Sequence, residues 1–271
     1  RPYGLVLCVG PTGSGKTTTL HSALSYINMP ERKIWTAEDP IEITQSGLRQ
    51  VQVNAKIDWT FAKALRSFLR ADPDIIMVGE IRDQETAQVA IEASLTGHLV
   101  LSTLHTNNAA ESVMRLLELG LDPVNFADSL LGIVAQRLVR ALCTRCRATE
   151  PLDARGWQSL LDEYIQSSPL SREEAERRLL AAAGVQSPQA MQVGVAVGCS
   201  HCGGKGYKGR MGIYEILENA HPVRELIRRN APPTEIFDAA VSAGMRSLRH
   251  DALEKAVQGR IDLAQARTAY L

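Results

Sequence analysis

The stretch LVLCVGPTGSGKTTTL, residues 5–20, decides the fold that we expect for this chain. Its apolar start, residues 5–9, has the pattern of a buried β-strand, and its end, from Thr17, is typical of the opening of a helix. Between them, residues 10–17 match the pattern G-x-x-x-x-G-K-[ST] in full. A strand, a glycine-rich loop and a helix in this order predict a phosphate-binding loop.

The chemistry of that loop predicts binding of ATP or GTP together with Mg²⁺. Glycines let backbone N–H groups approach the phosphates, and the helix N-terminus adds a partial positive charge. Lys16 is then expected to reach the β- and γ-phosphates, and the Thr17 hydroxyl to hold Mg²⁺. The alternative is a glycine-rich turn that matches by chance, and the flanking strand and helix argue against it. The predicted nucleotide-binding residues of the loop are Gly10, Pro11, Thr12, Gly13, Ser14, Gly15, Lys16, Thr17 and Thr18.

Length and composition are ordinary for a soluble globular chain. The 271 residues can bury a substantial core in one large domain or two, with 45% hydrophobic and 22% charged residues. Thirty basic and thirty acidic residues cancel, so no global field favours nucleic acid or an anionic membrane. No apolar run approaches the about 20 residues of a membrane span. The chain begins inside the first strand and has no signal peptide, so we expect an N-terminal part to be missing from this sequence.

Strand patterns alternate with helical patterns through the first half of the chain. Apolar runs predict strands at 33–37, 75–78 and 99–104, and the run at 75–78 is typical of a strand buried on both faces of a parallel sheet. Apolar residues at helical spacing predict helices over 59–70, 86–96, 109–119 and 124–131. This alternation predicts an α/β domain with a mainly parallel sheet.

Acidic residues follow two of the expected strands, at the strand ends where ligands bind in open α/β sheets. Glu38 and Asp39 follow the strand at 33–37, and Glu80 follows the strand at 75–78. An acid in this second place is the usual partner of a phosphate loop, because it can bind Mg²⁺ through water or position the attacking water.

Two histidines bracket the expected strand at 99–104. A single histidine is more often a structural residue than a catalytic one. His98 and His105 lie within Thr-Gly-His and Leu-His-Thr, and this placement makes γ-phosphate sensing about as good an interpretation as a structural role.

Four segments, in this order, resemble the motifs of the secretion ATPase superfamily. GPTGSGKTTTL is similar to its Walker A motif, TAEDPIE to its Asp box, DPDIIMVGEIRD to its Walker B motif with Gly before Glu, and TGHLVLSTLHT to its His box. The similarity spans nearly the whole chain. It implies a RecA-like C-terminal motor domain that hydrolyses ATP and works as a hexameric ring.

The resemblance also implies roles for individual residues. These are phosphate and Mg²⁺ binding for Lys16 and Thr17, positioning or activation of the attacking water for Glu38 and Glu80, support of the metal shell for Asp39, and γ-phosphate sensing for His98 and His105. In this family a preceding domain supplies further arginines to the nucleotide site. We expect that domain to belong to the missing N-terminal part.

Two C-x₂-C pairs predict a structural zinc site. Four thiolates at this spacing suit tetrahedral Zn²⁺, because each two-residue turn presents two sulfurs to one ion. The stretch between the pairs, 147–198, is longer than in a usual zinc ribbon, and two unrelated pairs or redox-active dithiols are the alternative. The predicted zinc ligands are Cys143, Cys146, Cys199 and Cys202. The tetracysteine element resembles that of type II secretion and type IV pilus assembly ATPases, and retraction ATPases generally lack it.

The expected organisation has three parts. Residues 1–142 form a RecA-like nucleotide-binding core, 143–210 a tetracysteine zinc-binding element with a helical insert, and 211–271 a returning strand and a C-terminal helical part. Within the last part we expect a strand at 211–217 and helices at 223–227, 234–243 and 248–257, with a short final helix from Asp262.

Three functions compete. The first is a hexameric motor that drives a membrane platform, the second a zinc-ribbon nucleic-acid translocase, and the third a catalytically inactive, nucleotide-gated scaffold. The balanced charge argues against the second, and the presence of Lys16, Thr17, Glu38 and Glu80 argues against the third.

The resemblance implies the partners of the motor as well. They are five further copies in a homo-hexamer, an inner-membrane platform protein and a cytoplasmic recruitment protein, with no nucleic acid expected. The implied location is the cytoplasm, peripheral at the cytoplasmic face of the bacterial inner membrane. The implied ligands are ATP, Mg²⁺ and Zn²⁺.

Overall fold

The computed structural model describes residues 3–270, and the chain divides into two compact units. The first unit comprises Arg1–Ala135 and Ile216–Ala240, and the second comprises Gln136–Glu215 and Val241–Leu271. Each unit is therefore assembled from two stretches that lie far apart in the sequence. Within residues 3–270, no helix has the length and apolar character needed to cross a bilayer.

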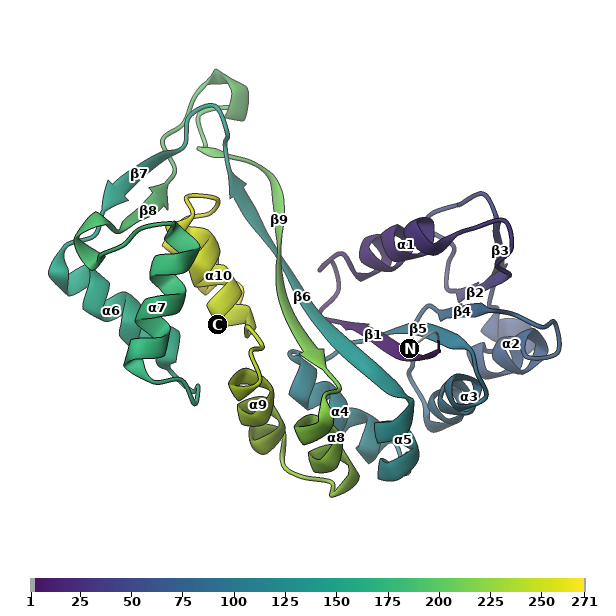
Figure 1. The fold of residues 1–271 in the computed structure, drawn as a ribbon. Helices are drawn as coiled ribbons and strands as arrows, with labels where there is room; N and C mark the ends of the chain where they lie inside the picture. Colours follow the sequence, from purple (N-terminus) through teal and green to yellow (C-terminus); the bar gives the residue numbers. More distant parts are fainter. Residues whose placement is uncertain (1–2, 271) are drawn as a thin grey trace. The chain divides into compact units, whose positions relative to one another are not determined.

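A seven-stranded sheet with the order β3-β2-β4-β5-β1-β6-β9 organises the fold (Figure 1). The strand pairs from β3 across to β6 are all parallel, which confirms the predicted mainly parallel sheet. β4 is buried at every position, as its uninterrupted apolar run predicts. The strands are β1 (Gly4–Val9), β2 (Ile34–Glu38), β3 (Leu48–Gln52), β4 (Ile75–Val78), β5 (Leu99–Leu104), β6 (Leu130–Leu142) and β9 (Tyr207–Glu218).

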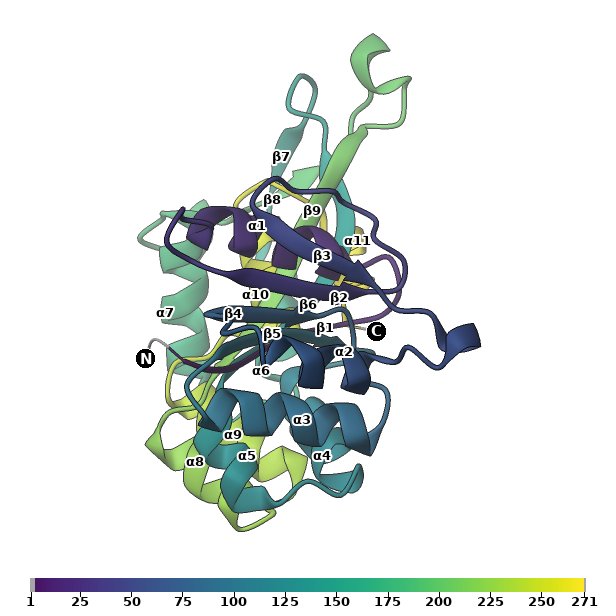
Figure 2. The ribbon, with the colours of Figure 1, turned by 90° about the vertical axis from the view of Figure 1, so that its right-hand side faces the viewer.

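Helices cover both faces of the sheet in the first unit. Helix α1 lies on one face, and α2, α3 and α5 lie on the other (Figures 1 and 2). Leu20 and Leu24 of α1 pack against the sheet together with Cys8, Ile34 and Met77 in one buried cluster. The helices are α1 (Lys16–Ile27), α2 (Phe61–Phe68), α3 (Gln84–Leu95), α4 (Ala109–Glu118), α5 (Pro123–Ser129), α8 (His221–Arg228) and α9 (Pro233–Ser242).

The register of the sheet decides where the site forms. Val9 of β1 pairs with Leu104 of β5, and Val78 of β4 pairs with Ser102 of β5. Because these strands are parallel, the loops that leave their carboxyl ends open along one edge of the sheet. The phosphate loop, both acidic motifs and the residue after β5 all follow such ends.

Two strands of this sheet were not predicted. β3 is a polar edge strand, Leu48–Gln52, whose residues are half-buried or exposed and therefore show no apolar pattern. Residues 132–142 were given no element, yet β6 extends over Leu130–Leu142 after α5 ends at Ser129. Its burial does not alternate regularly, so periodicity did not mark it as a strand.

The second unit combines helices with a small antiparallel sheet of two strands. β7 (Ala148–Pro151) pairs with β8 (Gln192–Val195), so the segment between the cysteine pairs contains strands as well as the expected helices. A buried cluster joins Trp157, Leu161, Leu179, Ile213 and Leu253. The helices are α6 (Ala154–Ile165), α7 (Arg172–Ala183), α10 (Leu248–Val257) and α11 (Leu263–Arg267).

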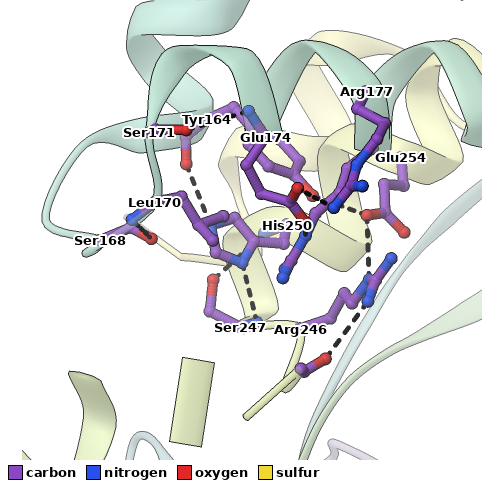
Figure 3. A network of polar contacts seen from close by, with 12 residues as sticks. Tyr164, Ser168, Leu170, Ser171, Glu174, Arg177, Arg246, Ser247, His250 and Glu254 are labelled. Carbon is purple, nitrogen blue, oxygen red and sulfur yellow. Dashed lines mark hydrogen bonds and ion pairs between the residues drawn. The ribbon is translucent and has the colours of Figure 1, made fainter. Parts of the chain in front are cut away.

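A buried polar network ties α6 to α10 inside the second unit (Figure 3). The Ser247 N–H donates to Nδ1 of His250 at 3.3 Å, so Nε2 carries the proton and donates to the Tyr164 carbonyl oxygen at 3.0 Å. The imidazole stacks on the Tyr164 ring with centroids 4.4 Å apart, and the Tyr164 hydroxyl donates to Glu254. Burial, together with the nearby arginines, lowers the pKa of His250 to about 4, although the hydrogen bond to the Tyr164 carbonyl raises it in part.

We therefore expect the unfolding free energy of the protein to depend on pH through His250. The pKa of an unfolded histidine is about 6.5, so the stability that neutral His250 contributes is fully present above that pH and is lost as pH falls through 4. His250→Gln should lower the unfolding free energy by about 1–3 kcal/mol at pH 7. The deficit should shrink between pH 6.5 and 4, measured by urea unfolding.

The matched control is His221→Gln, because His221 is exposed at the start of α8. It should follow the parent at every pH. A His250→Gln deficit that stays constant down to pH 4 would show that titration of this imidazole does not contribute.

Candidate nucleotide site and metal centre

The phosphate loop connects β1 to α1 as the motif requires. The helix begins at Lys16, and its N-cap residue Gly15 adopts a left-handed conformation with φ of 90°. Glycine adopts this conformation at no steric cost. No side chain caps the first turn of α1, so the positive end of the helix faces the loop with its backbone N–H groups.

Lys16 closes the loop on itself. Its buried ammonium donates to the carbonyl oxygens of Gly10, at 2.7 Å, and Pro11, at 3.1 Å. The Ser14 N–H donates to the Pro11 carbonyl at 3.2 Å, and the Gly10 N–H donates to Leu104 at the end of β5. These bonds set the loop at the carboxyl end of β1, with its lysine inside.

Glu38 is enclosed at the end of β2. Its carboxylate accepts hydrogen bonds from the Thr36 hydroxyl at 2.6 Å, from Nε2 of Gln50 at 2.9 Å and from Nε2 of His21 at 3.1 Å. The whole residue is only 3% exposed. Asp39, the next residue, has a half-exposed side chain whose Oδ2 lies 4.0 Å from Nη1 of Arg82.

Glu80 lies more openly at the end of β4, between two basic groups. Arg82 donates to its Oε1, and Nε2 of His105 lies 3.7 Å from its Oε2. The hydrogen bond to Glu80 raises the pKa of Arg82 above its usual range. The structure thus places Glu80 and His105, which follow β4 and β5, beside each other.

Gly79 permits this closeness of the two acidic motifs. Its N–H donates to the Ala37 carbonyl at 2.7 Å. A Cβ at this position would lie 3.2 Å from that carbonyl oxygen and 3.4 Å from Cα of Glu38. A side chain at this position would make a tight contact with the end of β2, and the glycine avoids that contact.

His98 lies at the opposite end of β5 from His105. Its Nδ1 is 2.9 Å from the Ala93 carbonyl, and its own carbonyl accepts from the Gly4 N–H at the start of β1. The six residues of β5 separate the two histidines by about 20 Å. The structure therefore does not bring His98 to the phosphate loop of its own chain.

Three residues of the site were missed by sequence analysis: His21, Gln50 and Arg82. His21 lies in the predicted helix after the loop but within an apolar face, and Gln50 lies on the unpredicted strand β3. Arg82 stands in the Gly-Glu-Ile-Arg-Asp segment itself, so its place two residues after Glu80 was a signal that could have been used.

The two cysteine pairs meet within the second unit. All four sulfurs lie within 4.8 Å of one another, with Cys143–Cys199, Cys146–Cys202 and Cys199–Cys202 separations of 4.0, 3.8 and 3.8 Å. Tetrahedral Zn²⁺ with Zn–S bonds of about 2.3 Å requires sulfurs about 3.8 Å apart. The four thiols therefore fit zinc, whereas a disulfide would need sulfurs at about 2.05 Å.

Backbone groups around Cys202 favour its thiolate. Burial raises the pKa of this thiol, but N–H donors of Cys199 and Gly206, each 3.2 Å from its sulfur, and the neighbouring thiols outweigh burial and bring it to about 6. Such donors are the outer contacts that orient metal-bound sulfur.

Exposed cations flank the cysteines in the sequence. No acidic residue occurs between Asp128 and Glu150 or between Glu176 and Glu215. The balanced total charge of the chain concealed this local excess. The exposed cations are Arg140, Arg145, Arg147, Lys205, Lys208 and Arg210.

We expect one Zn²⁺ per chain in elemental analysis. Chelation, or Cys146→Ser, should remove the metal and lower the thermal midpoint, because zinc binding contributes to folding free energy. Cys8→Ala is the matched control, since the buried Cys8 lies on β1, outside the cluster. A metal-free preparation with an unchanged thermal midpoint would contradict the zinc site.

Comparison with known proteins identifies one family, and the names of the similar proteins agree with it. The family described as type II/IV secretion system protein matches residues 1–268. The chain is 46% identical over 251 residues to the type II secretion system protein HxcR of Pseudomonas aeruginosa, covering 93% of this chain and 45% of that protein. It is 45% identical over 271 residues to the type IV pilus assembly ATPase PilB of Thermus thermophilus, covering 99% of this chain and 28% of that protein.

The fold has a counterpart among solved structures. The structure of the pilus retraction motor PilT with bound ADP matches 98% of this chain and 61% of that chain, with a TM-score of 0.66 and 29% identity. The type II secretion system ATPase E of Vibrio cholerae is 45% identical over 265 residues, with 98% of this chain and 48% of that protein covered. The chain thus spans about half the length, or less, of these curated relatives.

Proposed function

Because the chain belongs to the type II/IV secretion system protein family, we propose that it is the ATP-hydrolysing motor part of a bacterial type II secretion or type IV pilus assembly machine. The observation that carries the proposal is the convergence at one sheet edge. Lys16 in the phosphate loop, Glu80 after β4 and His105 after β5 all follow the carboxyl ends of neighbouring parallel strands.

The proposed division of labour follows from the contacts. Lys16 would exchange its two loop carbonyls for phosphate oxygens, and the Thr17 hydroxyl would hold Mg²⁺ with support from Asp39. Mg²⁺ would neutralise charge on the phosphates. Glu80 would orient the attacking water, because its carboxylate is the less enclosed of the two, with His105 beside it to meet the γ-phosphate. Glu38, at the end of β2, would help Glu80 to position the attacking water.

A motor for secretion or pilus assembly is favoured over a motor for pilus retraction. The four cysteines form a metal-sized cluster, and the resemblance ties such an element to secretion and pilus assembly ATPases. The relatives at 43–46% identity carry secretion or pilus assembly names, whereas the retraction motor PilT is 29% identical. We propose Zn²⁺ as a structural ion that shapes a surface for partners.

The proposed assembly is a homo-hexamer at the cytoplasmic face of the inner membrane, driving a platform protein and held there by a cytoplasmic recruitment protein. The exposed cations around the cysteines support a position beside the membrane, because the cytoplasmic leaflet carries a negative surface potential. They flank the cysteines in the sequence, and the phosphate loop belongs to the other unit.

Two substitutions test the hydrolytic site. Lys16→Ala should abolish turnover and sharply weaken nucleotide binding, because the charge that meets the β- and γ-phosphates is removed. Glu80→Gln should keep binding and lose turnover, because it preserves shape while removing the carboxylate. The measurements are steady-state ATPase activity and calorimetric affinity for Mg–ATP.

Lys33→Ala serves as the matched control, because Lys33 is an exposed partner of Asp72 at the far end of β2. Parent-rate hydrolysis by Lys16→Ala would refute the site. Normal turnover with lost affinity in Glu80→Gln would reverse the role of that residue.

Formation of the hexamer should set the rate of ATP hydrolysis. An arginine supplied from outside the phosphate-loop domain is worth about 10³–10⁵ in rate for this class of site. We expect residues 1–271 alone to bind Mg–ATP, to associate weakly and to hydrolyse slowly. A longer chain that carries the preceding part should gain hexamer formation and turnover together, in sedimentation and steady-state ATPase assays. Full activity of residues 1–271 as a monomer, independent of concentration, would overturn the ring mechanism.

A further inference from the structure

Glu38 has little freedom to contact a ligand by itself. Both of its carboxylate oxygens already accept hydrogen bonds, Oε1 from Thr36 and Gln50 and Oε2 from His21. With only 3% of the residue exposed, it is also shielded from water. A buried carboxylate is costly without such donors, so its position depends on the side chains that hold it.

His21 is the donor that comes from the phosphate-binding helix. It lies on α1, five residues after Lys16, and is 4% exposed. Its Nε2 is 3.1 Å from Oε2 of Glu38. The same rigid helix therefore carries Lys16 at its N-terminus and a side chain that binds the carboxylate at the end of β2.

The contact belongs to a closed ring of hydrogen bonds. Gln50 donates through Nε2 to Glu38 and accepts at Oε1 from the Gln45 N–H at 2.8 Å. The Gln45 side chain in turn lies 3.1 Å from Nδ1 of His21. Because Oε2 of Glu38 can only accept, Nε2 of His21 must carry the proton. The Gln45 amide can satisfy Nδ1 either by its oxygen or by its NH₂ group.

We propose that His21 is a positioning residue that holds the Glu38 carboxylate in register with the phosphate loop. This proposal rests on the proposed ATPase function and adds a positioning residue to the same site. Movement of α1 when nucleotide enters the loop would be transmitted through His21 to the acidic motif of β2. Closed networks of this kind act as units, so loss of one member disturbs the others.

The test compares variants that separate shape from hydrogen bonding. His21→Phe keeps a planar ring without a donor, and His21→Gln keeps a donor amide. We expect His21→Phe to lower kcat about 10- to 100-fold, the effect of a misplaced catalytic group, with KM for ATP changed by less than about 3-fold. His21→Gln should recover most of that loss. His221→Phe, at the exposed first residue of α8, should match the parent.

A double-mutant cycle tests whether the loss of kcat in His21→Phe acts through Glu38. If His21 acts through Glu38, His21→Phe should cost little further kcat in a Glu38→Gln background, and the two losses should not add. Additive losses would overturn the proposal. Parent-like kcat in His21→Phe, or a loss that follows the fall in thermal midpoint and is not recovered by His21→Gln, would do so as well.

A second measurement does not depend on hydrolysis. The ¹⁵N chemical shifts of the His21 ring show which nitrogen bears the proton, and the proposal requires Nε2–H with and without a non-hydrolysable ATP analogue. A ring protonated on Nδ1 alone cannot donate to Glu38 and would overturn the proposal. If the parent protein shows Nε2–H but hydrolyses no ATP, the proposed ATPase function is wrong. The hydrogen bond from His21 to Glu38 is then still supported.

Discussion

The parallel pairing of β1 with β5 and of β5 with β4 is the constraint on which the site depends. Val9, Val78 and Leu104 end these strands at the same edge of the sheet. A parallel sheet gathers at that edge the loops that leave every strand, and each loop then contributes one kind of group. The phosphate loop supplies an ammonium and a helix N-terminus, β4 supplies Glu80, and β5 supplies His105.

The two acidic motifs share this edge but differ in environment. Glu38 is sealed by three donors, whereas Glu80 is held between Arg82 and His105, both of which are at least half exposed. Gly79 makes the closeness possible because only hydrogen occupies the space against Ala37. The two carboxylates therefore have different surroundings, because Glu38 contacts His21 of α1 and Glu80 contacts two partly exposed basic groups.

The cluster of four cysteines depends on a different constraint. Cys143 follows β6, and Cys199 and Cys202 precede β9, strands that are neighbours in the sheet. This pairing brings Cys143 and Cys199 to 4.0 Å although 56 positions separate them. The intervening helices and the β7–β8 pair fold into the second unit without lengthening the loops that hold the sulfurs.

The sequence by itself determined the phosphate loop, the order of strands and helices around it, the acids after β2 and β4, and the zinc-like spacing of cysteines. These are local patterns, because a backbone turn, a buried run or a two-residue knuckle requires particular residues at adjacent positions. Tertiary structure decided the rest. Only the sheet register shows that His105, and not His98, lies at the end of β1 that leads into the phosphate loop, and only side-chain packing brings His21 and Gln50 to Glu38. Neither β3 nor β6 has a periodic pattern, and the contacts that define both strands come from distant segments.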